Sequence, residues 1–103
     1  MIRIGMVDDH PAMIVGASTI INLQPGMHVA AAAPTVDALI AQKTQLDLVL
    51  LDLALADQTT PARNLRILGE MAIPVLADTS GERASLVQQA VKSGAVGIIR
   101  KSE

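Results

Sequence analysis

Short apolar runs alternate with helix-like segments along the whole chain, and this alternation limits the possible folds more than any other feature. The runs cover residues 2–7, 27–33, 46–51, 73–77 and 95–99. Runs that are apolar at almost every position are typical of parallel strands covered on both faces. Strict alternation with helices predicts one parallel sheet with right-handed crossovers. We therefore predict an α/β fold of three layers, with helices on both faces of the sheet.

Local signals place four helices between the runs. Pro11 suits the first position of a helix that ends near residue 23, and Thr35 is the expected N-cap of the second. Thr60-Pro61 opens the third helix, and Gly94 ends a fourth over residues 82–93. The residues predicted to face the core in the third and fourth helices are Leu65, Leu68, Met71, Leu86, Val87, Ala90 and Val91.

Composition narrows the class of protein. A chain of 103 residues is long enough for one domain, so we treat residues 1–103 as one unit. The net charge of −2 gives no basic surface for nucleic acid. The absence of cysteine excludes disulfides and cysteine-bound zinc, and it fits a cytoplasmic location. The longest apolar stretch, 46–56, is interrupted by Asp47 and Asp52, so we expect no membrane-spanning helix.

Polar residues stand where four of the apolar runs stop. These residues are Asp8, Asp9, Asp52, Thr79 and Lys101. Ligands of open parallel sheets bind in the crevice at the carboxyl ends of the strands. The pattern therefore places three carboxylates, a hydroxyl and an ammonium around one crevice, which is a suitable site for a divalent cation and a phosphoryl group.

Each polar residue also has a simpler interpretation. The Asp8-Asp9 pair could be an acidic turn that caps the next helix. Asp52 is harder to explain in this way, because a charge in a central strand is costly unless it is paired or metal-bound. His10 precedes Pro11 at a helix start, which favours a structural role over metal ligation.

Several motifs together resemble a known family. They are Asp8-Asp9-His10-Pro11, the strand end Leu50-Leu51-Asp52-Leu53, Thr79-Ser80, Gly94-Ala95 and Arg100-Lys101-Ser102. This set resembles the receiver domain of bacterial two-component response regulators. The run Asp-Asp-His-Pro is most similar to the NarL/FixJ branch, whose members carry a C-terminal LuxR-type helix-turn-helix. The resemblance implies a flavodoxin-like receiver fold with strand order 2-1-3-4-5.

The resemblance also implies a chemical role for each site. Asp52 would be the phosphoacceptor for a sensor histidine kinase, Thr79 would bond a phosphoryl oxygen, and Lys101 would pair with the phosphoryl group. Phosphorylation would regulate a DNA-binding output domain. The receiver would catalyse only its own phosphorylation and dephosphorylation, so it would not be an enzyme in the usual sense.

The cofactor implied by the resemblance is Mg2+. Asp8 and Asp9 would hold the ion, with Asp52 as a third carboxylate and the backbone carbonyl of Ala54 as a further ligand.

The chain departs from the family pattern at three places. Ile98 stands where the family usually has an aromatic switch residue, and Ala56 stands where it often has proline. The chain ends at Glu103, so we expect the fifth helix and the output domain to be absent from it. An uncovered sheet face would then favour a homodimer or a domain-exchanged oligomer, and DNA would be contacted only through the absent output domain.

Two other functions fit parts of the pattern. A receiver that is not phosphorylated could act as a protein-interaction module. A metal-dependent phosphatase with Asp52 as nucleophile would need a second acid two residues later, but that position is Ala54. Mass measurement after incubation with acetyl phosphate and Mg2+ separates the three functions.

Overall fold

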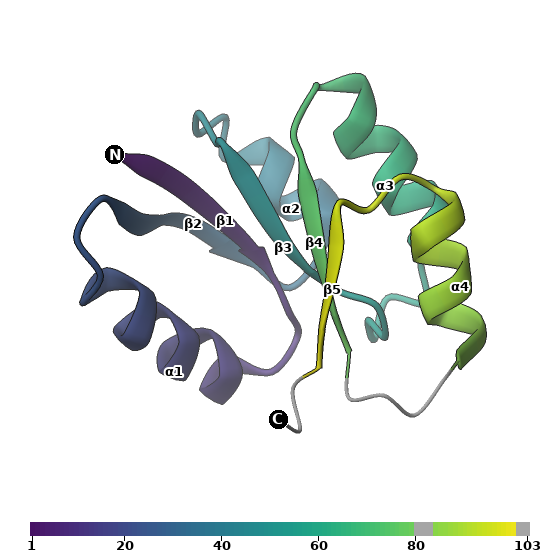
Figure 1. Ribbon diagram of the computed structural model, residues 1–103, viewed down its shortest axis with the longest axis horizontal. Helices are drawn as coiled ribbons and strands as arrows, with labels where there is room; N and C mark the ends of the chain where they lie inside the picture. The colour runs from purple at the N-terminus through teal and green to yellow at the C-terminus, as the bar shows by residue number, and fades with distance from the viewer. Residues whose placement is uncertain (80–83, 101–103) are drawn as a thin grey trace.

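The computed structural model describes residues 1–79 and 84–100. Strands and helices alternate from β1 to β5 (Figure 1). The elements are β1 (Ile2–Val7), α1 (Pro11–Asn22), β2 (Met27–Ala33), α2 (Val36–Ala41), β3 (Leu48–Asp52), α3 (Pro61–Glu70), β4 (Val75–Thr79), α4 (Ala84–Lys92) and β5 (Gly97–Arg100). Within these residues, no helix is long and apolar enough to cross a membrane.

The five strands form one parallel sheet in the order β2-β1-β3-β4-β5. This confirms both the α/β class predicted from the alternation and the order implied by the resemblance. Since β1 and β3 are neighbours, the residues that follow β1 lie beside the end of β3. The order thus brings together acidic residues that are more than forty positions apart in the sequence.

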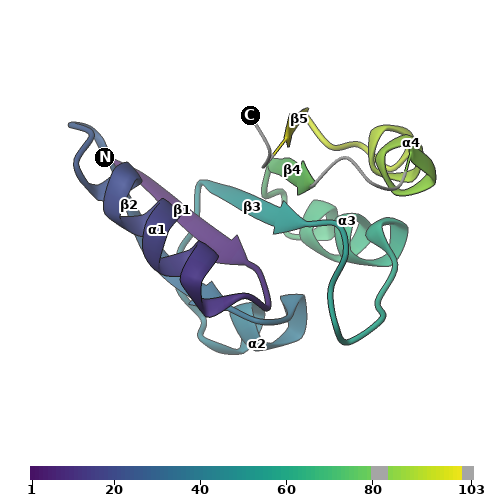
Figure 2. The same cartoon turned by 90° about the horizontal axis from the view of Figure 1, so that it is seen from below.

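Helices cover both faces of the sheet. Helix α1 lies on one face, and α2, α3 and α4 lie on the other (Figures 1 and 2). The larger core forms under α2–α4, where Val7, Val49, Leu51, Val75 and Ala77 are all buried. Their burial fits the prediction that strands covered on both faces are apolar at nearly every position.

Two threonines start helices as the sequence predicts. Thr35 Oγ1 accepts a hydrogen bond from the backbone N–H of Ala38 at the start of α2. Thr60 Oγ1 accepts one from the N–H of Arg63 at the start of α3, where Pro61 occupies the first helical position. Each hydroxyl satisfies a backbone donor that has no partner inside its helix.

Three strands have boundaries other than those predicted, at both ends. β3 is Leu48–Asp52 instead of 46–51, β4 is Val75–Thr79 instead of 73–77, and β5 is Gly97–Arg100 instead of 95–99. The strands extend because pairing continues past the apolar runs, with Asp52 opposite Asp78 and Asp78 opposite Ile99. Apolar runs identify strands, whereas backbone pairing decides where they end.

The predicted inward faces of α3 and α4 are largely correct. Leu65, Leu68 and Ala90 are buried, but Met71 and Val91 are exposed, so those two predictions are wrong. Met71 is the C-cap residue that follows α3. Val91 directly follows the buried Ala90, and successive helical residues point about 100° apart.

The face that carries α1 is covered unevenly. Ile4 and Met6 are buried on β1, and the hydroxyl of Ser18 on α1 donates to the sulfur of Met6 over 3.7 Å. Further along the same face, Leu50 and Leu76 are only half-buried and Ile99 is 45 % exposed. The part of this face over β3–β5 therefore presents apolar side chains to solvent.

An ion pair ties the start of β1 to the segment before β3. The guanidinium of Arg3 and its backbone N–H both donate to Asp47. The side-chain hydrogen bond, followed by the backbone one, lowers the pKa of Asp47 below its ordinary value. The pair therefore stabilises the fold above the ordinary carboxyl pKa, and that contribution is lost as pH falls through the lowered pKa.

Replacing Thr60 by alanine should destabilise the domain by about 1 kcal/mol, the usual cost of losing an N-cap hydroxyl. Thr60→Ser keeps the hydroxyl and is the matched control. Urea unfolding followed by circular dichroism measures both variants. Equal stability of Thr60→Ala and wild type would show that this cap contributes nothing.

Candidate functional site

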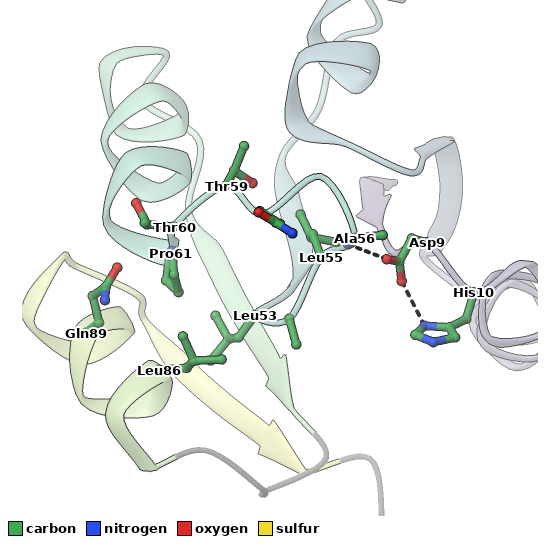
Figure 3. A pocket seen from close by; sticks show the side chains of 12 residues that line it. Asp9, His10, Leu53, Leu55, Ala56, Thr59, Thr60, Pro61, Leu86 and Gln89 are labelled. Carbon is green, nitrogen blue, oxygen red and sulfur yellow. Dashed lines mark hydrogen bonds and ion pairs between the residues drawn. The ribbon is translucent and has the colours of Figure 1, made fainter.

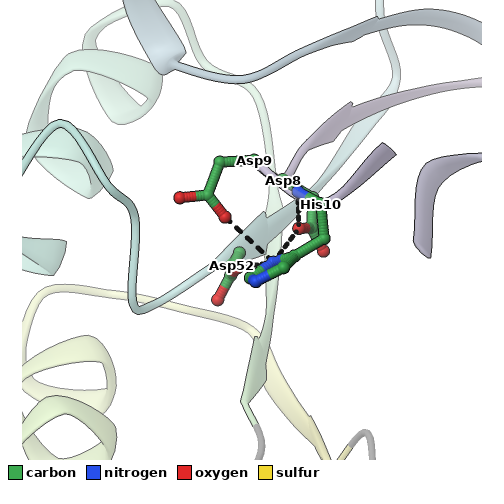
Figure 4. A group of neighbouring side chains, drawn as sticks. All are labelled: Asp8, Asp9, His10 and Asp52. Carbon is green, nitrogen blue, oxygen red and sulfur yellow. Dashed lines mark hydrogen bonds and ion pairs between the residues drawn. The ribbon is translucent and has the colours of Figure 1, made fainter. Parts of the chain in front are cut away.

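Three aspartates converge where β1 and β3 end. One ligand atom from each of Asp8, Asp9, His10 and Asp52 lies within 4.8 Å of the others (Figure 4). Asp8 and Asp52 are only 3 % and 4 % exposed. Carboxylates this close and this buried repel one another, and a cation among them offsets both the repulsion and the cost of burial. Asp8, Asp9 and Asp52 thus lie together, as the sequence led us to expect, and their chemical roles stay predictions.

Backbone N–H groups hold one oxygen of each carboxylate. Asp8 Oδ1 accepts from the N–H of His10 over 2.9 Å, and Asp52 Oδ1 accepts from the N–H of Ala54 over 3.0 Å. Asp9 Oδ2 accepts from the N–H of Ala56 in the loop after β3. These bonds fix the carboxylate orientations, and Asp9 Oδ1 and Asp52 Oδ2 are left on the side facing the imidazole of His10.

The sequence favoured a structural role for His10, and the structure places its ring beside the three carboxylates. Its side chain makes no capping hydrogen bond at the start of α1. Instead, Nδ1 lies 3.0 Å from Asp8 Oδ1, 2.9 Å from Asp9 Oδ1 and 3.9 Å from Asp52 Oδ2. The available sequence signal was the Asp-x-His spacing, because an aspartate often accepts the N–H two residues on and thereby turns the chain.

The remaining predicted site residues have different outcomes. Thr79 ends β4 beside β3 and is 6 % exposed, and its role toward a phosphoryl group stays a prediction. Lys101 lies outside the described residues. Ala54 stands two residues after Asp52, and the role of its carbonyl as a metal ligand stays a prediction.

An open cavity of about 580 Å3 adjoins the cluster. Asp9 and His10 lie at one end of it, and Leu86 and Gln89 of α4 lie at the other (Figure 3). The loop after β3 lines the middle, and Gln89 Oε1 accepts the N–H of Ala62 at the start of α3. A polar group can therefore approach Asp9 and His10 between that loop and α4.

The acidic residues fit a divalent cation. Asp9 Oδ1 is buried and has no hydrogen-bond partner among the residues that the structure describes. A buried carboxylate oxygen in this state needs a positive charge nearby. Carboxylate oxygens are the donors that Mg2+ prefers, and Mg2+ keeps several waters, so a small number of protein ligands suffices.

Comparison with known families decides the class of protein. Residues 4–103 match the model of the response regulator receiver domain. The chain belongs to this family. It is accordingly a receiver domain of a two-component response regulator, a signalling module with an acidic cluster near the expected phosphorylation site.

Solved structures agree with the fold. A LuxR-family two-component response regulator from Aurantimonas sp. SI85-9A1 superposes with a TM-score of 0.85 at 28% identity, covering 98% of this chain and 74% of that one. The receiver domain of the putative regulator NarL from Mycobacterium tuberculosis gives 0.84 at 23% identity, covering 99% and 85%. The isolated REC domain of RcsB from Salmonella enterica serovar Typhimurium, with the phosphomimetic BeF3-, gives 0.85 at 15% identity, covering 99% and 78%. No curated protein sequence matches the chain.

Mg2+ should raise the melting temperature of this domain, because a ligand that binds only the folded state stabilises it by mass action. At one hundred times its dissociation constant the gain is about 2.7 kcal/mol. Asp9→Asn should lose most of this gain, and Glu70→Gln, which alters an acid outside the cluster, should keep it. An equal response of all three proteins in a thermal titration would place the cation elsewhere.

Proposed function

We propose that this receiver accepts a phosphoryl group on Asp52, in an Mg2+-dependent reaction, from the phosphohistidine of a sensor kinase. The observation that carries the proposal is the position of Asp52. It is a buried carboxylate at the end of a central strand, with two further carboxylates beside it. A structural role alone gives no reason to place three like charges together with two of them buried.

Asp52 has the geometry expected of a nucleophile. The N–H of Ala54 holds Oδ1 over 3.0 Å, and Oδ2 lies on the side of the cluster that His10 faces. One oxygen of the Asp52 carboxylate attacks phosphorus, the phosphorus–nitrogen bond of the phosphohistidine breaks, and the leaving imidazole nitrogen keeps the electron pair. Phosphoryl transfer depends mainly on positioning and on charge neutralisation. Mg2+ would supply the neutralisation, and the groups that would hold it are the carboxylates of Asp8, Asp9 and Asp52 and the carbonyl of Ala54.

The product would carry more negative charge than the free carboxylate, so it needs donors. We assign to Thr79 a hydrogen bond to a phosphoryl oxygen, and to Lys101 an ion pair with the phosphoryl group. Thr79 supports this role because it ends β4, the strand that pairs with β3.

The proposed partner on the input side is a sensor histidine kinase, and the proposed output is control of transcription. The similarity at 28% identity to a LuxR-family regulator supports an output domain of the LuxR type, which would make the contacts to DNA. A receiver that works without phosphorylation, as an interaction module, is the alternative.

Incubation with acetyl phosphate and Mg2+ should give one labile phosphoryl adduct by intact mass. Asp52→Ala should give none while remaining folded, because the substitution removes a buried charge from an acidic site. Asp57→Asn changes an aspartate that hydrogen-bonds to Thr59 in its own loop and lies outside the acidic cluster, and it should be phosphorylated like wild type.

The other outcomes point to other functions. Absence of an adduct on folded wild type would favour the interaction module, and an adduct on Asp52→Ala would remove Asp52 from its role. Continuous release of phosphate at enzyme-like rates would indicate a phosphatase.

We also propose that the chain forms a homodimer or a domain-exchanged oligomer through the sheet face that carries α1. Leu50, Leu76 and Ile99 lie on this face and remain partly exposed over β3–β5. Exposed apolar patches of this kind mark interaction surfaces, and a second copy related by two-fold symmetry is the commonest partner.

Ile99→Lys should therefore weaken self-association, because it places a charge in the interface. Val91→Lys is the matched control, since Val91 is also exposed but lies on α4 over the opposite face. Light scattering across a concentration series measures both. A wild type that stays monomeric at high concentration would contradict the proposal.

A further inference from the structure

We propose that Nδ1 of His10 is a direct metal ligand, and that it makes the acidic cluster prefer a first-row divalent cation that accepts nitrogen over Mg2+. The inference rests on the proposed function, in which the same carboxylates hold a cation. It adds a ligand, and with it a metal preference, that the carboxylates alone do not give.

The distances around Nδ1 match the spacing of ligands on one ion. An octahedral cation with bonds of ~2.1 Å holds adjacent donors about 3.0 Å apart and opposite donors about 4.2 Å apart. Nδ1 lies 3.0 Å from Asp8 Oδ1 and 2.9 Å from Asp9 Oδ1, the separations of adjacent donors. Asp52 Oδ2, at 3.9 Å, is close to the separation of an opposite donor. The imidazole therefore stands where a fourth ligand would stand.

A hydrogen bond from His10 does not account for all of these contacts. Nδ1 lies within hydrogen-bonding geometry of Asp8 Oδ1. The contact with Asp9 Oδ1 is shorter, yet this buried oxygen has no hydrogen-bond partner anywhere in the described part of the chain. One proton on Nδ1 can make a well-aligned hydrogen bond to only one of the two oxygens, whereas a cation between them is bonded by the nitrogen and the oxygens together.

The site is held in this arrangement by the backbone. The N–H groups of Ala56 and Ala54 bind one oxygen each of Asp9 and Asp52, and the other oxygens face Nδ1. The N–H of His10 itself binds Asp8, which turns the ring back over the carboxylates (Figure 4). The side chain of His10 is 65 % exposed, so the ring closes the solvent side of the cluster without itself being buried. The side chains of the proposed ligands would therefore need little rearrangement to bind an ion.

The donor set determines which cations gain from His10. Oxygen-only sites suit Mg2+ and Ca2+, whereas imidazole favours Ni2+, Cu2+ and Zn2+. Three carboxylates still allow Mg2+ to bind, so the imidazole adds affinity for the nitrogen-accepting ions without excluding Mg2+. Ni2+ is a suitable probe, because it combines octahedral geometry with a preference for nitrogen.

Calorimetric titration with Ni2+ and with Mg2+, above the ordinary pKa of histidine, tests the assignment. His10→Asn should lower the affinity for Ni2+ by about tenfold or more, because even loss of a residue that supports a metal ligand costs that much. Its affinity for Mg2+ should stay the same or rise. His28→Asn removes the other imidazole of the chain and should leave both affinities unchanged. In the wild type, Ni2+ should broaden the ring-proton NMR signals of His10 before those of His28.

Two results would overturn the inference. Unchanged affinity for Ni2+ in His10→Asn would show that the imidazole is not a ligand, and equal losses for Ni2+ and Mg2+ would show a structural effect only. Phosphoryl uptake by the wild type with Mg2+, measured in parallel, separates this failure from failure of the proposed function. If the protein is phosphorylated but His10→Asn binds Ni2+ as tightly as wild type, only the role of His10 is contradicted.

Discussion

Repulsion among Asp8, Asp9 and Asp52 is the constraint on which the site depends. The strand order makes β1 and β3 neighbours, so their terminal carboxylates must share one crevice. Burial strengthens the repulsion, because little water remains to screen it. Backbone donors offset part of this repulsion. The N–H groups of His10, Ala54 and Ala56 each donate to one carboxylate oxygen. The conformations of the two loops at the crevice therefore follow from the need to satisfy these charges.

The sequence predicted the sheet and the acidic cluster for the same reason. Apolar runs that alternate with helices give a parallel sheet, and all strands of such a sheet end at one edge. Residues that follow those runs must then be neighbours, wherever they stand in the chain. The strand ends were predicted less well. Asp78 and Thr79 are polar, so the sequence pattern placed them after the strand, but their pairing with β5 includes them in β4. The strand order came from the family resemblance and not from the pattern.

His10 could not be placed from the sequence, and the reason is geometric. Its neighbour Pro11 indicates only that a helix starts there. The direction of the ring depends on the turn in which Asp8 accepts the N–H of His10, and on the two other carboxylates that the ring then meets. One of these, Asp52, is 42 positions away in numbering and is brought near only by the pairing of β1 with β3. The sequence around His10 therefore cannot show that its ring lies near Asp52.

Ala56, which stands where the family often has proline, makes a hydrogen bond that proline could not make. A proline, which the family often has at this place, carries no N–H, so it could not donate to Asp9. Ala56 does donate, to Oδ2, and this bond joins the loop after β3 to the acidic cluster across 47 positions of sequence. The same loop lines the cavity beside the cluster. A cation bound by Asp9 Oδ1 would therefore share this carboxylate with the loop, which holds the other oxygen. Asp9 thus links the acidic cluster to the loop that lines the adjoining cavity.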